Sequence, residues 1–319
     1  MYEFLCKRCR ERMQNATGAA DGRRVYQIAI NSVLLKLKSM LHLMRKFIAA
    51  FCCLAFLFAS CRVNRPSGAE AGKVDWKKIH VLVYTKNGKG YVHDNIPSAV
   101  ACIRELGQEN GFSVDVSDDP GVFTEDNLKQ YNALIFTSTN NDVFDTEAQK
   151  VAFMRYTQAG GGFVGIHSVT GTERKWEWFK RLVGGTFVRH ARMQRFQQLI
   201  VDKNHPSTSF LPDRWENEDE CYYVTTINPD LHVLLAHDLR TVEDKEKPVV
   251  FGHSFPSVWC HEFDGGRQWY TALGHRKEMY SEPLFRRHIL GGLEWTVQGN
   301  RKPDFSKATA RTPDDPLPY

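Results

Sequence analysis

The chain lacks a cysteine framework and an excess of positive charge beyond its first sixty residues. The expected folded domain contains an odd number of cysteines, Cys102, Cys221 and Cys260, so no disulfide framework is indicated, and Cys102 is expected to be a small buried hydrophobe on a helix. Residues 1–60 carry a net charge of +7 and the whole chain +5, which leaves −2 for residues 61–319. This balance disfavours nucleic-acid binding.

Nucleotide-binding patterns are also missing. The loop at residues 86–95 contains glycines and precedes an expected helix, but neither a P-loop nor a G-x-G-x-x-G pattern is present. We therefore expect no nucleotide cofactor.

The apolar run at residues 47–60 is too short to span a membrane. It follows Met44-Arg45-Lys46 and ends in small residues before Cys61, which is typical of a secretory signal peptide. Ala59-Ser60-Cys61 resembles a bacterial lipobox, in which Cys61 would be lipidated and attach the protein to a membrane. We expect a lipoprotein of the cell envelope, facing the periplasm or on the outer membrane. A plain cleaved signal or an unprocessed amphipathic segment is the alternative.

These features divide the chain into five parts. If the signal begins at Met44, the preceding extension could reflect the choice of start site. The predicted parts are an N-terminal extension (1–43), a lipoprotein signal peptide (44–60), a polar tether (61–75), a folded domain (76–299) and a surface tail (300–319).

Strand-like and helix-like segments alternate along the first half of the folded domain. Apolar, β-branched runs predict strands at 79–85, 112–116, 133–138 and 163–167. Helical spacing and capping residues predict helices at 96–106, 124–129 and 145–158. This alternation predicts an α/β fold with a doubly wound, mostly parallel sheet.

The second half of the domain shows a different pattern. Helices are expected at 172–183 and 281–297. Short strands, interpreted as antiparallel additions to the sheet, are expected at 196–201, 221–226, 233–236, 249–251, 258–263 and 268–273.

The leading site candidate is His167, at the carboxyl end of the strand that follows the glycines at 160–162. Ligands of open parallel sheets bind at this end of the strands. The loops after the first and third strands bring further polar residues to the same edge, namely Thr85, His93, Asn140 and Asn141. The alternative for His167 is a buried histidine with a purely structural role.

Five short motifs together resemble the ThuA-like (trehalose utilisation) family over residues 77–299. They lie at 90–94, 161–168, 182–185, 219–222 and 273–276. The resemblance implies a flavodoxin-like fold similar to class I glutamine amidotransferases, and a role in sugar metabolism on disaccharides or 3-keto sugar derivatives. Some members are labelled secreted glycosyl hydrolases.

In the amidotransferases a cysteine nucleophile occupies the turn between strand and helix where His167 stands in this sequence. No cysteine is nearby, and an imidazole does not replace a thiolate that must form and release an acyl group. Glutamine hydrolysis is therefore not expected. A cytoplasmic amidotransferase-like regulator is disfavoured for the same reason and by the signal peptide.

The matched motifs add Glu220 and His275 to the site, with His190 and Glu218 as further candidates. We predict a carbohydrate ligand, with His93, His167, Glu220 and His275 as catalytic residues and Thr85, Asn140, Asn141 and His190 as substrate-binding residues.

Two chemistries fit these residue types. Histidine and carboxylate side chains can exchange protons with a sugar hydroxyl or with a carbon next to a ketone. They can also bind a divalent metal such as zinc, with His93, His167 and His275 as ligands and Glu220 as a ligand or base. The sequence lacks the tight H-x-x-x-H spacing of many zinc sites, so both chemistries stay open.

A glycosidase with paired carboxylates is a rival mechanism, but the sequence identifies no second acid to act with Glu220. A rival function is a non-catalytic carbohydrate-binding or accessory module on the same fold. Sugar binding without turnover would distinguish it from an enzyme.

Overall fold

The computed structural model describes residues 73–317, which form helices and strands in alternation followed by a largely β second half. The helices of more than one turn are α3 (Ile96–Asn110), α4 (Glu125–Leu128), α5 (Glu147–Gln158), α6 (Glu177–Val183) and α7 (Pro283–Thr296). The strands are β1 (His80–Tyr84), β2 (Ser113–Ser117), β3 (Ala133–Thr137), β4 (Gly162–Ile166), β5 (Thr186–His190), β6 (Gln194–Ile200), β7 (Arg214–Asp219), β8 (Tyr222–Thr225), β9 (His232–Asp238), β10 (Ser254–Phe263) and β11 (Gly266–Thr271).

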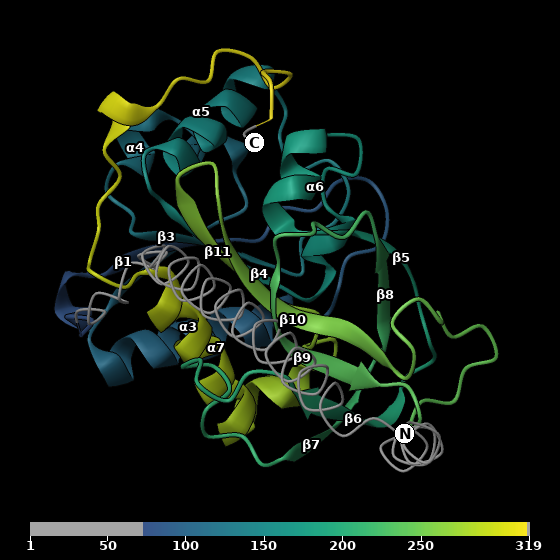
Figure 1. Cartoon of the computed structure of the whole chain (residues 1–319). Coiled ribbons are helices and arrows are strands. Elements are labelled where there is room, and N and C mark those ends of the chain that lie inside the picture. Colours follow the sequence, from purple (N-terminus) through teal and green to yellow (C-terminus); the bar gives the residue numbers. More distant parts are fainter. Residues whose placement is uncertain (1–72, 318–319) are drawn as a thin grey trace, which may run out of the picture. The chain divides into compact units, whose positions relative to one another are not determined.

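A nine-stranded sheet forms the centre of the fold, in the order β2-β1-β3-β4-β11-β10-β9-β6-β7, and β5 pairs with β8 in a separate two-stranded sheet (Figure 1). The strands from β2 to β11 are parallel. From β11 to β7 the neighbours are antiparallel. The predicted α/β fold with a parallel core and antiparallel additions is confirmed. Two of the strands expected as additions differ: β8 lies in the separate sheet, and β11 extends the parallel part by pairing with β4.

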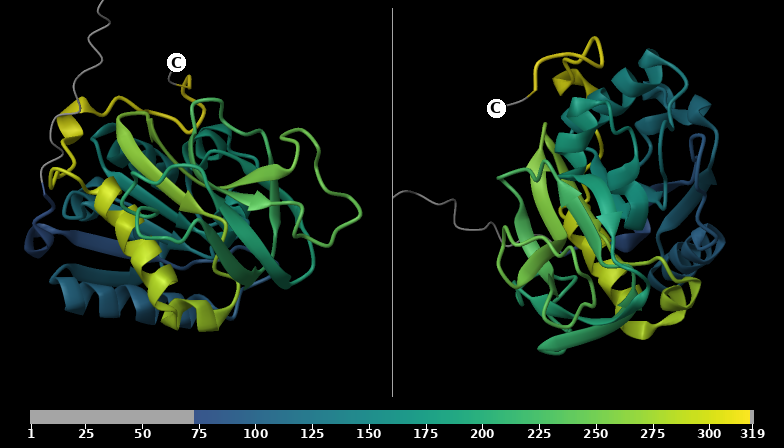
Figure 2. Two further views of the ribbon diagram at one scale, coloured as in Figure 1. Left: turned by 60° about the horizontal axis from the view of Figure 1, so that its bottom comes forward. Right: turned by 90° about the vertical axis from the view of Figure 1, so that its right-hand side faces the viewer.

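Helices cover both faces of the parallel strands. Helices α3 and α7 lie on one face, and α4, α5 and α6 lie on the other (Figures 1 and 2). Every residue of β3 and β4 is buried, because a strand covered on both faces has no side chain that points to solvent. This burial explains why β3 and β4 are continuous apolar runs, the pattern from which both strands were predicted.

Local capping sets the start of the helices that flank the site. Thr124 caps α4 by accepting a hydrogen bond from the backbone of Asn127, as predicted. Helix α5 begins with a capping box, in which Thr146 and Gln149 each bind the other residue's backbone N–H.

Two expectations about secondary structure are wrong. Residues 249–251 were expected to form a strand, but they lie in an exposed turn. Strand β7 was not expected, because its sequence Arg-Trp-Glu-Asn-Glu-Asp is highly charged. It is the last strand of the nine-stranded sheet and exposes alternate side chains to solvent, where charge costs little.

The expected helix at 172–183 is shorter than the sequence suggested. A 3-10 helix (His167–Gly171) follows β4, and α6 begins only at Glu177. The backbone between them turns sharply at Glu173, whose φ is +47°. A residue in this left-handed region does not continue a right-handed helix.

The segment expected to be a surface tail packs against the domain. The indole nitrogen of Trp176 donates to the carbonyl of Pro313 at 2.9 Å, Arg155 donates to the carbonyls of Ala308 and Ala310, and Ala310 is 3% exposed. These contacts order the chain across α5 as far as the described residues extend.

The predicted extension, signal peptide, Cys61 and most of the tether lie outside the described residues. Between residues 73 and 317, no helix combines the length and the apolar character needed to cross a bilayer.

Candidate active site

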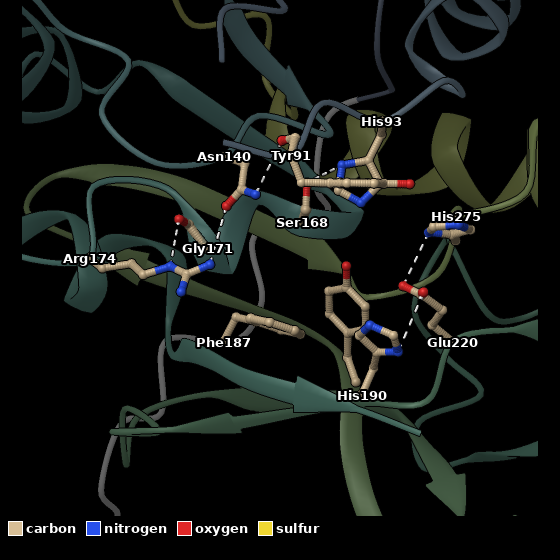
Figure 3. Close-up of a pocket in the computed structure, with 11 residues that line it drawn as sticks. Tyr91, His93, Asn140, Ser168, Gly171, Arg174, Phe187, His190, Glu220 and His275 are labelled. Atoms are coloured by element: carbon tan, nitrogen blue, oxygen red, sulfur yellow. Dashed lines mark hydrogen bonds and ion pairs between the residues drawn. The ribbon is translucent and has the colours of Figure 1, made fainter. Parts of the chain in front are cut away.

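A cavity of about 390 Å³ lies at the carboxyl ends of the parallel strands. The loops after β1, β3, β4 and β11 form one side, and the sheet of β5 and β8 forms the other (Figure 3). This is the edge of an open α/β sheet where ligands bind. The lining residues are Tyr91, His93, Asn140, Ser168, Gly171, Arg174, Phe187, His190, Glu220, Tyr222 and His275.

His167 occupies a sharp turn directly after β4. It is fully buried, and its φ of +60° places a residue other than glycine in the left-handed region. Its Nδ1 lies 3.0 Å from the carbonyl oxygen of Ala272, which can only accept, so Nδ1 donates and Nε2 keeps its lone pair. The hydroxyl of Tyr222 lies 3.0 Å from this Nε2 and donates to it.

The ring of His93 is oriented by a serine that follows His167 in sequence. Ser168 donates its hydroxyl proton to the carbonyl of Thr139 at 3.0 Å, so it accepts from Nδ1 of His93 at 3.3 Å. The Nε2 atom of His93 is thereby left as the lone-pair nitrogen. Both buried histidines therefore carry their proton on Nδ1 and leave Nε2 as the basic atom.

His275 completes the cluster from the loop after β11. Its Nδ1 lies 3.2 Å from Nε2 of His167 and 3.1 Å from a carboxylate oxygen of Glu220. The other carboxylate oxygen of Glu220 lies 3.4 Å from Nδ1 of His190, so one carboxylate bridges two imidazoles.

Asp219 fixes the backbone on which this arrangement depends. It is fully buried, and its carboxylate accepts hydrogen bonds from the N–H groups of Gly274 at 2.7 Å, His275 at 3.2 Å and Glu220 at 2.8 Å. One side chain therefore ties the loop that bears His275 to the strand end that bears Glu220.

The pKa values of the three histidines differ because their surroundings differ. Burial lowers the pKa of His93 to about 4 and lowers the pKa of His167 well below its ordinary value. The hydrogen bond to Glu220 raises the pKa of His275. Two neutral imidazoles therefore lie beside a third that is paired with a carboxylate.

This donor set fits a metal ion. One ligand atom each of His93, His167 and His275 lies within 4.8 Å of the others. Two tetrahedral zinc ligands at ordinary bond lengths are about 3.3 Å apart. Nδ1 of His275 and Nε2 of His167 already lie 3.2 Å apart, and His93 would have to move closer to them. The Nδ1–H bonds to Ala272 and Ser168 are the type of second contact that orients metal-bound histidines.

Six of the eight predicted site residues are brought together here. Five of them line the cavity, and the sixth, His167, is fully buried directly behind the lining, in contact with Tyr222 and His275. Thr85 and Asn141 do not line the cavity: the hydroxyl of Thr85 lies 3.5 Å from the carbonyl of Ser117, and the amide of Asn141 donates to the carbonyl of Lys89 at 3.1 Å. The further candidate Glu218 pairs with Arg276.

Several residues at the site were not predicted. Tyr91, Ser168, Asp219 and Tyr222 lie inside matched motifs, which gave a signal that could have identified them. Arg174 and Phe187 lie in no motif, and only the folded chain places them in the cavity wall.

The sheet order and the position of the site define a flavodoxin-like α/β protein with the fold of class I glutamine amidotransferases and a histidine at the strand-to-helix turn. The family model for trehalose utilisation, ThuA, matches residues 80–296, so the chain belongs to the ThuA family. This membership indicates a carbohydrate-related role.

Solved structures of ThuA-like proteins are similar to this chain. A protein from Bacteroides uniformis aligns with a TM-score of 0.61 and 25% identity, over 75% of this chain and 100% of that one. A protein from Parabacteroides merdae aligns with a TM-score of 0.56 and 21% identity, over 74% of this chain and 94% of that one. A search of curated proteins found no match.

Proposed function

We propose that this protein is an enzyme that hydrolyses or isomerises a small carbohydrate, a disaccharide or a 3-keto glycoside. The observation that carries the proposal is the convergence of His93, His167, His275 and Glu220 at one cavity. Family membership supports the substrate class.

The geometry favours proton transfer next to a ketone over direct displacement by two carboxylates. Among the described residues that line the cavity, Glu220 is the one carboxylate, whereas a glycosidase of the paired type needs two. The Nε2 atom of His93, which lines the cavity, is a basic site that is neutral at pH 7, as proton abstraction requires, and Nε2 of His167 behind it accepts from Tyr222.

The remaining groups have complementary roles in this proposal. Tyr222 holds a phenolic proton beside Nε2 of His167, and His275, whose pKa is raised by the hydrogen bond to Glu220, holds a proton in that bond. A zinc ion bound by the three histidines is the alternative: it would occupy their lone pairs and would polarise the substrate ketone or lower the pKa of a bound water, with Glu220 as the base.

The test combines metal analysis with turnover. Purified protein is analysed for metal content and assayed with trehalose and with 3-keto disaccharides, alongside His93→Ala, His167→Ala and the control His253→Ala, which changes an exposed residue. We expect turnover in wild type and control and its loss in the two site variants. Stoichiometric metal that is lost in the same variants identifies the metal-assisted route, and a metal-free wild type identifies acid-base catalysis. Wild-type turnover in His167→Ala would refute the proposed role of this cluster.

We also propose that the protein is attached to the cell envelope through a lipid on Cys61. The charged start, short apolar run and lipobox-like Ala59-Ser60-Cys61 support this proposal. A Cys61→Ser variant should move from the membrane fraction to the soluble fraction and lose incorporation of labelled fatty acid. Unchanged fractionation and labelling would refute it.

A further inference from the structure

One side of the cavity holds a cation that the proposed chemistry does not use. Arg174 lines the cavity wall, and its guanidinium is fixed by two hydrogen bonds to uncharged acceptors. Its Nε donates to the carbonyl of Gly171 at 2.9 Å, and its Nη2 donates to the side-chain oxygen of Asn140 at 3.3 Å.

No carboxylate within residues 73–317 forms an ion pair with Arg174. The carboxylate of its neighbour Glu173 is buried and binds the N–H groups of Val143 and Phe144 and the ammonium of Lys150. Glu220 lies across the cavity from Arg174 and is paired with histidines (Figure 3). The cavity therefore contains a fixed positive charge that its own wall does not neutralise.

The orientation of the guanidinium leaves a pair of donors free. A guanidinium has five N–H groups, and Nε with one N–H of Nη2 forms the edge that binds Gly171 and Asn140. Both N–H groups of Nη1 and the second of Nη2 have no acceptor among the described residues. Parallel N–H groups of this kind match two oxygens of a carboxylate or phosphate.

Phe187 lies between this cation and the histidine cluster. Its half-buried ring is 5.6 Å from the guanidinium carbon of Arg174, and its centroid is 4.7 Å from that of Tyr222. Phe187 lines the cavity, and an aromatic ring packs well against the apolar face of a sugar ring. The cavity thus offers an anion-binding group, an apolar surface and a basic cluster in succession (Figure 3).

We propose that the substrate is an anionic sugar, whose carboxylate or phosphate group binds Arg174 while its ring packs on Phe187 and its reacting carbon faces the histidines. This inference rests on the proposed carbohydrate function and specifies its substrate class. Asn140 is a positioning residue in this arrangement, because it holds the edge of the guanidinium that does not face the ligand.

The experiment measures binding of four probes by calorimetry at one ionic strength: glucose, glucuronate, glucuronamide and glucose 6-phosphate. Wild type is compared with Arg174→Gln and with Arg192→Gln, an exposed arginine that pairs with Glu243. A charge-assisted hydrogen-bonded pair should make the anionic probes bind about 10- to 100-fold more tightly than glucose. Arg174→Gln should abolish this preference and leave the affinity for glucose unchanged, and Arg192→Gln should retain the preference.

The probes also separate the two anion types. Tighter binding of glucuronate than of glucuronamide identifies a carboxylate as the group recognised. Tighter binding of glucose 6-phosphate than of glucose identifies a phosphate. Equal affinity for charged and neutral sugars, or a preference that survives in Arg174→Gln, would overturn the inference and leave the proposed function standing. Failure of every probe to bind would also overturn the inference, and the proposed function is judged separately by turnover of trehalose and 3-keto disaccharides.

Discussion

The hydroxyl of Tyr222 lies 3.0 Å from Nε2 of His167, and the opposite ring nitrogen of His167 donates to the carbonyl of Ala272. Because Ala272 fixes the tautomer, the tyrosine is the donor in this pair. Burial raises the pKa of Tyr222 well above its ordinary value, so the phenol keeps its proton. A proton donor and a basic nitrogen are therefore held together at the cavity.

Tyr222→Phe removes this proton and keeps the ring that packs on Phe187. We expect kcat to fall at least about tenfold, the equivalent of one hydrogen bond, with little change in thermal stability. Steady-state kinetics and thermal unfolding provide the measurements. The control is Tyr223→Phe on the next residue of β8, which does not line the cavity and should keep wild-type kcat. Equal kcat in wild type and Tyr222→Phe would contradict a role for this hydroxyl.

Asp219→Asn should weaken the loop that holds His275. The amide keeps the shape of the carboxylate but turns an NH₂ group toward a backbone N–H, so a buried donor loses its acceptor at a cost of about 1–3 kcal/mol. We expect a lower free energy of unfolding in denaturant and reduced turnover. Glu216→Gln, an exposed change on the same strand, should affect neither. An Asp219→Asn protein with wild-type values of both would show that this carboxylate does not position His275.

The positive φ of His167 predicts an order of stability among substitutions. Asparagine tolerates the left-handed region, whereas a β-branched side chain is disfavoured there by about 1–2 kcal/mol. We expect His167→Asn and His167→Val both to lose activity, with the asparagine variant the more stable in thermal unfolding. The opposite order would indicate that this backbone conformation relaxes when the imidazole is removed.

Buried histidines make stability depend on pH. Burial lowers the pKa of His205 and His237 to about 3 and of His288 to about 4, whereas an unfolded histidine titrates near pH 6.5. Between the folded and unfolded pKa values of these histidines, the unfolded chain binds more protons than the folded protein. The free energy of unfolding should therefore fall as the pH falls from about 6.5 to 4. Asp219, whose pKa burial raises to about 7, opposes this trend as a single group.

The contribution of one histidine can be isolated with His288→Asn. We expect the slope of unfolding free energy against pH, measured in denaturant between pH 4 and 6.5, to decrease by about 1.4 kcal/mol per pH unit. The control is His253→Asn in an exposed turn. An unchanged slope in His288→Asn would mean that this histidine is protonated in the folded protein.

Much of the sheet could be predicted because its signals are local. Strands β3 and β4 are apolar at every position, since both faces are covered by helices, and the glycines before β4 mark the end of α5. Strand β7 gave no such signal, because one of its faces meets solvent and accepts charged residues. The apolar run at 249–251 was wrongly predicted to be a strand. A run of three apolar residues is too short to distinguish a strand from an exposed turn, where these residues lie.

By itself the sequence determined where the first four strands lie along the chain. It also placed His93, Asn140 and His167 in loops at one sheet edge, because the carboxyl ends of parallel strands meet there. Only the tertiary structure decided that Thr85 and Asn141 face away from the cavity. It also brought Phe187 into the wall through the pairing of β5 with β8, and Arg174 from the loop between the 3-10 helix and α6. Alternating patterns specify each element, but the contacts between side chains distant in sequence arise only when the whole chain has packed.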